Sequence, residues 1–125
     1  MKATQRAGLS PERFSRFSRG QQLLTIANEM NRASKLLGGG DVPRLRNAYE
    51  RVLALADLTI AVNPSRSLRR ELLRWRDLVA EQYVAETPDF RAHAAAFRAL
   101  LQFHPATWQQ LPYVTGAASH PRSPN

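Results

Sequence analysis

The chain contains 125 residues, with 18 Lys and Arg against 10 Asp and Glu, a net charge of +8 and no cysteine. A chain of this length forms one domain by default and buries enough surface to sustain a core. The lack of cysteine excludes disulfides, thiolate metal sites and nucleophilic cysteine chemistry. No apolar run approaches the roughly 18 residues that span a bilayer, and the first residues lack a signal-peptide core. We therefore expect a cytoplasmic protein with no membrane partner.

Helical periodicity and capping residues predict two helices in the first third of the chain. Ser10 followed by a proline places an N-cap hydroxyl before a residue that suits the first helical position, which predicts a short helix over 10–17. Ser18 with Gln21 three residues later is a capping-box pattern, so a longer helix is expected over 19–37. Three consecutive glycines then end that helix.

The helix expected over 41–63 has the widest apolar face in the chain. Asp41 is its predicted N-cap, and the Asn-Pro pair that starts at Asn63 ends it. The apolar arc is wider than a single stripe, which indicates a central helix with neighbours on more than one side. The stripe consists of Leu45, Ala48, Tyr49, Val52, Leu55, Ala56, Thr59 and Val62, and the residues that widen it are Leu53, Leu58 and Ile60.

Two further long helices are predicted in the second half of the chain. One begins at Pro64 or Ser67 and ends at Glu86, with an apolar face made of Leu68, Leu72, Trp75, Leu78, Val79 and Tyr83. The other runs over 87–103 and starts at Thr87 as its cap. Its buried face is expected to contain Phe90, Ala94, Phe97, Leu100 and Leu101.

The fold predicted from these elements is all-α. It is an antiparallel four-helix bundle with a short extra N-terminal helix and a short C-terminal helix over 105–111. The expected domain organisation is a basic N-terminal arm over 1–18, a helical bundle domain over 19–111 and a flexible tail over 112–125. The tail is rich in Pro, Ser and Gly, a composition that does not support a packed core.

The surplus positive charge gathers in two arginine-rich blocks. One lies near the N-terminus, and the other lies at the start of the third long helix, where it runs against the helix dipole. Arginines at a helix N-terminus are suited to binding phosphate, so these blocks are a candidate site for nucleic acid or another polyanion. The candidate residues are Arg13, Arg16, Arg19, Arg66, Arg69, Arg70 and Arg74.

An alternative interpretation treats the arginines as a solvated face that pairs with acids on adjacent helices. The acids available for such pairs are Glu29, Glu50 and Asp57. Because Asp57 stands in an otherwise apolar stretch, we expect its carboxylate to meet an arginine at a helix interface. The sequence alone leaves both interpretations open.

The sequence contains no pattern that predicts a metal ion, a cofactor or a catalytic triad. Asp89 and His93 at i,i+4 offer two ligands of a metal site, but a carboxylate so close to a helix start also complements the dipole. We favour that structural interpretation. His93 and His104 share one edge of the last helix but lie roughly 16 Å apart along it, too far to hold one ion.

Two resemblances add expectations. The segment from Arg98 to His104, RALLQFH, resembles the Arg-x4-6-His signature of the HEPN superfamily, small helical bundles that include dimeric ribonucleases. This resemblance implies that Arg98 and His104 form a catalytic pair at a dimer interface and cleave RNA by acid–base chemistry. Over 21–103, the stretches LLTIANEMNRASKLL, LRNAYERVLALADLTI and LRRELLRWRDLVAEQY resemble small uncharacterised bacterial all-helical proteins, which implies helical architecture and no particular activity.

Three functions follow as hypotheses. The leading one is a non-enzymatic helical binding or assembly module with a basic surface, which forms a homo-oligomer or binds another protein. The surfaces suspected in self-association are the wide apolar arc of the helix over 41–63 and the exposed aromatic side chains of Phe14, Phe17 and Trp108, with core packing as the alternative for each. The second hypothesis is a nucleic-acid-binding protein that uses the arginine blocks, and the third is a HEPN-like ribonuclease.

Overall fold

The structure is a computed structural model that describes residues 9–104. Over this range the protein is all-helical, without strands, and its five helices pack against one another. They are α2 (Pro11–Ser15), α3 (Arg19–Leu36), α4 (Val42–Val62), α5 (Arg66–Val84) and α6 (Phe90–Leu101). No described helix is both long enough and apolar enough to cross a membrane. The helix expected over 105–111, the tail over 112–125 and Trp108 lie outside the described residues.

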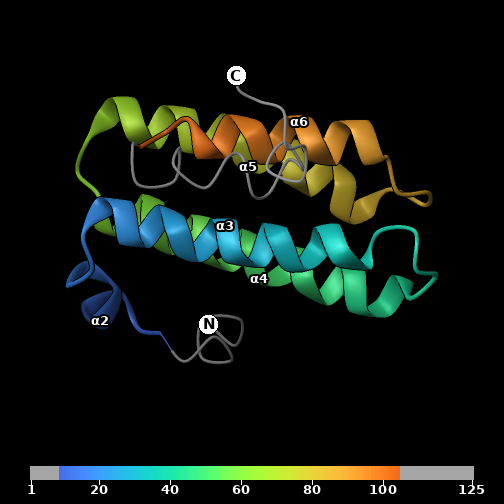
Figure 1. Ribbon diagram of the computed structural model, residues 1–125. Coiled ribbons are helices and arrows are strands. Elements are labelled where there is room, and N and C mark those ends of the chain that lie inside the picture. The colour runs from blue at the N-terminus through green and yellow to red at the C-terminus, as the bar shows by residue number, and fades with distance from the viewer. Residues whose placement is uncertain (1–8, 105–125) are drawn as a thin grey trace, which may run out of the picture.

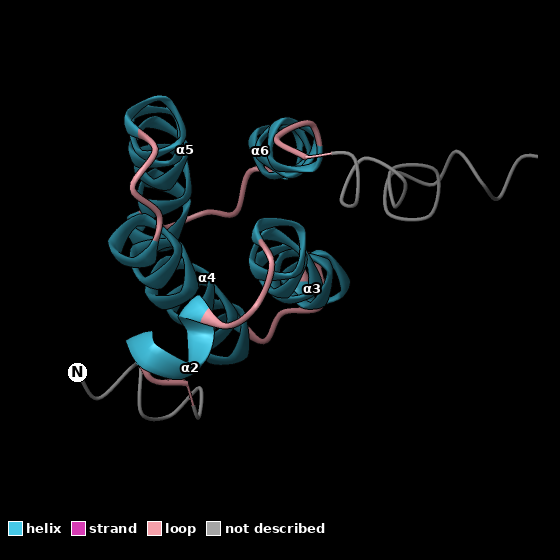
Figure 2. Ribbon diagram, turned by 90° about the vertical axis from the view of Figure 1, so that its left-hand side faces the viewer, coloured by secondary structure: helices cyan, strands magenta, loops and turns pink. Residues whose placement is uncertain are grey.

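The four long helices lie side by side, and each runs opposite to the one before it (Figure 1). The helix α4 packs against α3 and α5, and α6 packs against the same two helices. Figure 2 shows these helices close to end-on, with the short helix α2 beside α4, against which it packs. Since the direction alternates, α3 and α5 begin at the end where α2 lies, while α4 and α6 begin at the other end (Figure 1).

Local signals set the beginnings of the first three described helices. The Ser10 side chain caps α2, Ser18 and Gln21 form a complete capping box on α3, and Asp41 caps α4. The turn between α3 and α4 needs glycine, because Gly38 and Gly40 have φ angles of 77° and 81°. These predicted starts and the glycine stop are therefore confirmed.

The starts of the last two helices differ from the prediction. Ser65 caps α5 by accepting a hydrogen bond from Leu68 N at 3.2 Å, between the two predicted starts. Asp89 rather than Thr87 caps α6, where its carboxylate accepts a hydrogen bond from Ala92 N at 3.1 Å. Thr87 was the wrong choice because aspartate is the better N-cap of the two residue types.

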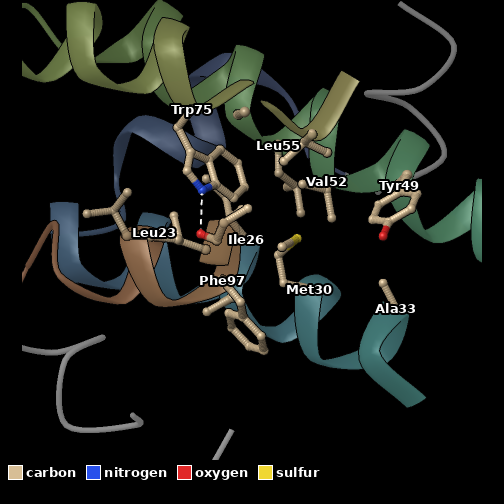
Figure 3. Packing of buried hydrophobic residues seen from close by; sticks show 14 of the residues in the cluster. Leu23, Ile26, Met30, Ala33, Tyr49, Val52, Leu55, Trp75 and Phe97 are labelled. Carbon is tan, nitrogen blue, oxygen red and sulfur yellow. Dashed lines mark hydrogen bonds between the residues drawn. The ribbon is translucent and has the colours of Figure 1, made fainter. Parts of the chain in front are cut away.

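One hydrophobic cluster joins all five helices. Figure 3 shows the centre of this cluster, where the Trp75 indole N–H donates to the Ala96 carbonyl oxygen at 2.7 Å and ties α5 to α6. The helix α4 has nine buried residues, which confirms that it is central. Phe14 is fully buried, so its assignment to an exposed surface was wrong, whereas Phe17 is 36% exposed. The short helix α2 is thus anchored to the main core through Phe14.

Three positions that were expected to be buried are exposed. Phe90 is 57% exposed, and it is the first residue of α6. Ala94 is exposed because the buried face of α6 passes through His93 instead. Leu78 is 48% exposed because α5 buries only a narrow face, Leu72, Trp75 and Val79.

Candidate nucleic-acid interface

A buried amide network fixes the end of the molecule where α3 and α5 begin. The Asn63 amide donates to Gln22 Oε1 at 2.7 Å and to the Thr59 carbonyl at 2.8 Å. The Gln22 amide donates to the carbonyl oxygens of Phe14 and Phe17, at 3.0 and 3.1 Å. Because Gln22 and Asn63 are buried, each bond lost would leave a polar group unsatisfied. The network therefore holds α2 and α3 to the end of α4.

The two arginine blocks meet at this network. Arg19 Nε lies 3.4 Å from Asn63 Oδ1, and Arg69 Nε donates to the Asn63 carbonyl at 2.6 Å and to the Ile60 carbonyl at 3.0 Å. Asn63 thus contacts one arginine from each block. We call this end of the molecule the arginine-rich end. It consists of α2, the first turns of α3 and α5, and the Asn63 network. The opposite end, which contains the Gly38–Gly40 turn, is called the glycine-turn end.

The structure brings most of the predicted arginines to the arginine-rich end. Arg13 lies on α2 and Arg16 is its C-cap, while Arg19 is the first residue of α3. Arg66, Arg69 and Arg70 lie in the first turns of α5. Arg74 lies farther along that helix, about 12 Å from Arg66 in axial rise. All seven side chains are exposed to solvent.

None of these seven arginines takes part in an ion pair with another residue of the described range. The ion pairs within residues 9–104 join Glu29 to Arg32 and Arg51, at 3.5 and 3.0 Å, and Asp57 to Arg76, at 2.6 Å. The arginine partner expected for Asp57 is thus confirmed as Arg76, which is outside the candidate set. The acid-paired interpretation thus holds for Arg76, which belongs to the arginine-rich block of the third long helix, and among the described residues it does not extend to the seven candidate arginines.

The arginine-rich end also contains the starts of two long helices. Ser18 caps α3 and Ser65 caps α5, and neither helix has an acidic residue in its first turn. The positive end of each of these two dipoles adds to the charge of the arginines, and no first-turn carboxylate offsets it. The helices α4 and α6 end here and bring the negative ends of their dipoles, and Arg69 donates to the Ile60 and Asn63 carbonyls at the end of α4. The starts of α3 and α5 are therefore the part of this end at which a phosphate is favoured.

A groove of 490 Å³ opens between the first turns of α3 and α5 and the end of α6. Its polar lining comes from Arg19, Ser65, Ser67, Glu71 and Gln102. Its apolar lining comes from Leu68, Ala99 and Phe103, of which Phe103 is half-buried and also packs against the core. The groove could not be predicted from the sequence, because its walls come from three separate helices.

His93 lies in a buried polar cluster rather than in a metal site. Its Nε2 lies 2.8 Å from the Ser34 hydroxyl, and its Nδ1 lies 2.9 Å from the Tyr49 hydroxyl. Because Ser34 donates to the Met30 carbonyl at 3.0 Å, its oxygen accepts from Nε2–H, and Tyr49 O–H donates to Nδ1. Burial lowers the pKa of His93 to about 4 and raises that of Tyr49 to about 12. The cluster is therefore neutral.

The structural interpretation of Asp89 and His93 agrees with their positions. Asp89 caps α6, and His93 points into the core between α3 and α4. Within residues 9–104, no group of three or more His, Asp or Glu side chains is placed to hold a metal ion.

The two residues of the HEPN-like signature lie on different kinds of structure. Arg98 is exposed on the last turns of α6, whereas His104 is half-buried beyond the end of that helix at Leu101. The catalytic roles of Arg98 and His104 stay a prediction. No family model, curated protein or solved structure matches this chain.

Proposed function

We propose that α3–α6 form an antiparallel four-helix bundle and that this bundle is a non-enzymatic binding module of the cytoplasm. Its arginine-rich end would bind the sugar-phosphate backbone of a nucleic acid. The observation that supports this best is the shared contact of Arg19 and Arg69 with Asn63, because it joins two blocks that lie far apart in the sequence.

The charge balance of this surface supports binding rather than a purely structural role. A solvated, self-satisfied surface would pair its arginines with nearby carboxylates, as Arg51 and Arg76 do elsewhere on α4 and α5. The seven candidate arginines have no such partner among the described residues. A phosphate backbone supplies the missing negative charge, and its binding is driven by the release of condensed counterions.

The test is a fluorescence-anisotropy titration of labelled single-stranded RNA and of duplex DNA at low and near-physiological salt. We expect binding that persists at the higher salt and whose logarithm falls linearly with the logarithm of the salt concentration. Complete loss of binding at the higher salt would refute the proposal. The recovered RNA is run on a gel, because cleavage that Arg98→Ala and His104→Ala abolish would favour the ribonuclease function instead.

A second candidate function is self-association through the glycine-turn end. An apolar pocket of 290 Å³ lies there between the α3–α4 turn and the start of α6. Phe90 and Val42 line it and are 57% and 39% exposed. Sedimentation at micromolar concentration tests this candidate. A dimer that Phe90→Ser dissociates would support it, and a monomer throughout would refute it.

A further inference from the structure

The groove at the arginine-rich end differs from a plain basic surface, because an apolar wall stands beside its charge. Leu68, Ala99 and Phe103 form that wall, and Arg19 faces the same space. All three side chains also pack against the hydrophobic core, and the parts of them that line the groove add an apolar surface that a phosphate does not use. A ligand that fills the whole groove must combine an anion with a flat or apolar part.

The polar side chains of the groove suit the edge of a nucleobase. Gln102 is exposed and its amide offers both a donor and an acceptor, while Ser67 adds a hydroxyl of either role. Bases bind proteins through stacking on aromatic or apolar side chains combined with hydrogen bonds to their edges. Phe103, half-buried in the lining, is the aromatic side chain of the groove, so the groove offers both an aromatic side chain and polar groups.

We propose that this groove binds an unpaired nucleobase and that the protein therefore prefers single-stranded nucleic acid to a duplex. This inference rests on the proposed backbone binding at the same end. In a duplex the bases are stacked and paired, so only phosphates reach the arginines. In a single strand, one base turns into the groove while its neighbouring phosphates contact Arg19, Arg66 and Arg70.

The volume of the groove agrees with this occupant. With a volume of 490 Å³, the groove is a shallow surface depression that offers room for one base. The groove is also open to solvent, and a base needs this opening because it remains attached to its strand. Glu71 is the one carboxylate in its lining, and removal of that charge as Glu71→Gln should strengthen the binding of every anionic ligand at this end.

The experiment compares a single strand and a duplex of the same sequence, binding to the full chain at one salt concentration. We expect the single strand to bind at least about tenfold more tightly to the wild type. Phe103→Leu keeps apolar volume against the core but removes the aromatic ring. It should weaken single-strand binding by about 5- to 150-fold and leave duplex binding unchanged. Phe103→Trp should retain the preference.

Two further variants keep the result interpretable. Ala99→Leu fills the groove without removing a core side chain, so it should abolish the single-strand preference even if Phe103→Leu fails to fold. Val84→Ala is the control at the glycine-turn end, because Val84 is an exposed apolar residue at the end of α5, and it should change neither affinity.

The two proposals fail in different ways. The base-binding groove would be overturned, and backbone binding left intact, if the wild type bound the single strand and the duplex with equal affinity. The same would follow if Phe103→Leu weakened the binding of the single strand and of the duplex equally. Absence of binding to either form would overturn backbone binding itself.

Discussion

The two ends of the molecule cap their helices with residues of different charge. At the arginine-rich end, the hydroxyls of Ser18 and Ser65 accept the cap hydrogen bonds of α3 and α5, at 3.1 and 3.2 Å. At the glycine-turn end, the carboxylates of Asp41 and Asp89 do the same for α4 and α6, both at 3.1 Å. The cap distances are nearly equal, so the ends differ in charge and not in cap geometry.

This difference in cap charge leaves more positive charge at the arginine-rich end than at the glycine-turn end. A serine cap satisfies a free N–H group but brings no negative charge, so it does not reduce the positive charge at the helix start. An aspartate cap satisfies the N–H group and neutralises the dipole together. The caps of α4 and α6 thereby reduce the positive charge at the glycine-turn end, whereas the caps of α3 and α5 leave the positive charge of the arginine-rich end unreduced.

The largest effect that we expect concerns the docking of α2, which brings Arg13 and Arg16 to the arginine-rich end. Phe14 is fully buried, so Phe14→Ala should lower the free energy of unfolding by about 3–5 kcal/mol. Chemical denaturation measures this loss. Phe17→Ala is the matched control and should cost far less, because Phe17 is 36% exposed. A loss below about 1 kcal/mol in Phe14→Ala would show that α2 is not part of the core.

The next effect concerns the neutral cluster of His93, Tyr49 and Ser34. The folded pKa of His93, about 4, is below the unfolded value of 6.5, so the unfolded chain takes up the proton first as the pH falls. The stabilisation is complete above pH 6.5 and is lost between pH 6.5 and about 4. At about 1.4 kcal/mol per pH unit, the total loss is about 3 kcal/mol.

Denaturation at several pH values between 6.5 and 5 tests this loss, because most carboxylates do not titrate there. His93→Gln should be less stable at neutral pH and should lose most of the pH dependence. The same slope in the variant and the wild type would show that another group is responsible.

The smallest effect comes from exchanging the caps between the two ends. Ser18→Asp with Ser65→Asp should raise the free energy of unfolding by about 0.3–1 kcal/mol per helix, since each carboxylate complements a dipole. The same double variant should bind nucleic acid more weakly, because its new charges repel phosphate. Thermal denaturation and anisotropy measure the two changes. Asp41→Ser with Asp89→Ser is the reciprocal control, which should lose stability and keep its affinity.

The helices could be predicted because their signals are local. Ser18 with Gln21, Asp41 with its proline in the first turn, and the glycine run each specify a boundary within a few residues of sequence. A predicted helix start was wrong where two possible N-cap residues lie close together in the sequence, as Thr87 and Asp89 do at the start of α6. Local patterns therefore predicted the helical elements and missed some of their ends.

The candidate site could not be predicted to the same extent, because it depends on long-range pairs. Gln22 and Asn63 are 41 residues apart, and no local sequence pattern near either residue predicts their hydrogen bond. The partners of His93 are equally remote, at Ser34 and Tyr49. The sequence predicted which arginines to suspect but not that they converge, since convergence follows from how α2, α3 and α5 pack.

The most direct test of this account compares two double charge reversals in single-stranded RNA binding. Arg66→Glu with Arg70→Glu changes the arginine-rich end, and Arg44→Glu with Arg91→Glu changes exposed residues near the starts of α4 and α6. Each pair lowers the net charge by four, from +8 to +4, so general electrostatics is matched. Glutamate in the first turns of α5 also favours the helix, so unfolding is not expected to weaken binding.

The account predicts that Arg66→Glu with Arg70→Glu weakens binding by about tenfold or more and makes the salt dependence shallower by about one to two units of slope. The control pair should retain most of the affinity and the full slope. Equal losses in the two double variants would contradict the account, because they would show that the net charge and not the arginine-rich end determines binding.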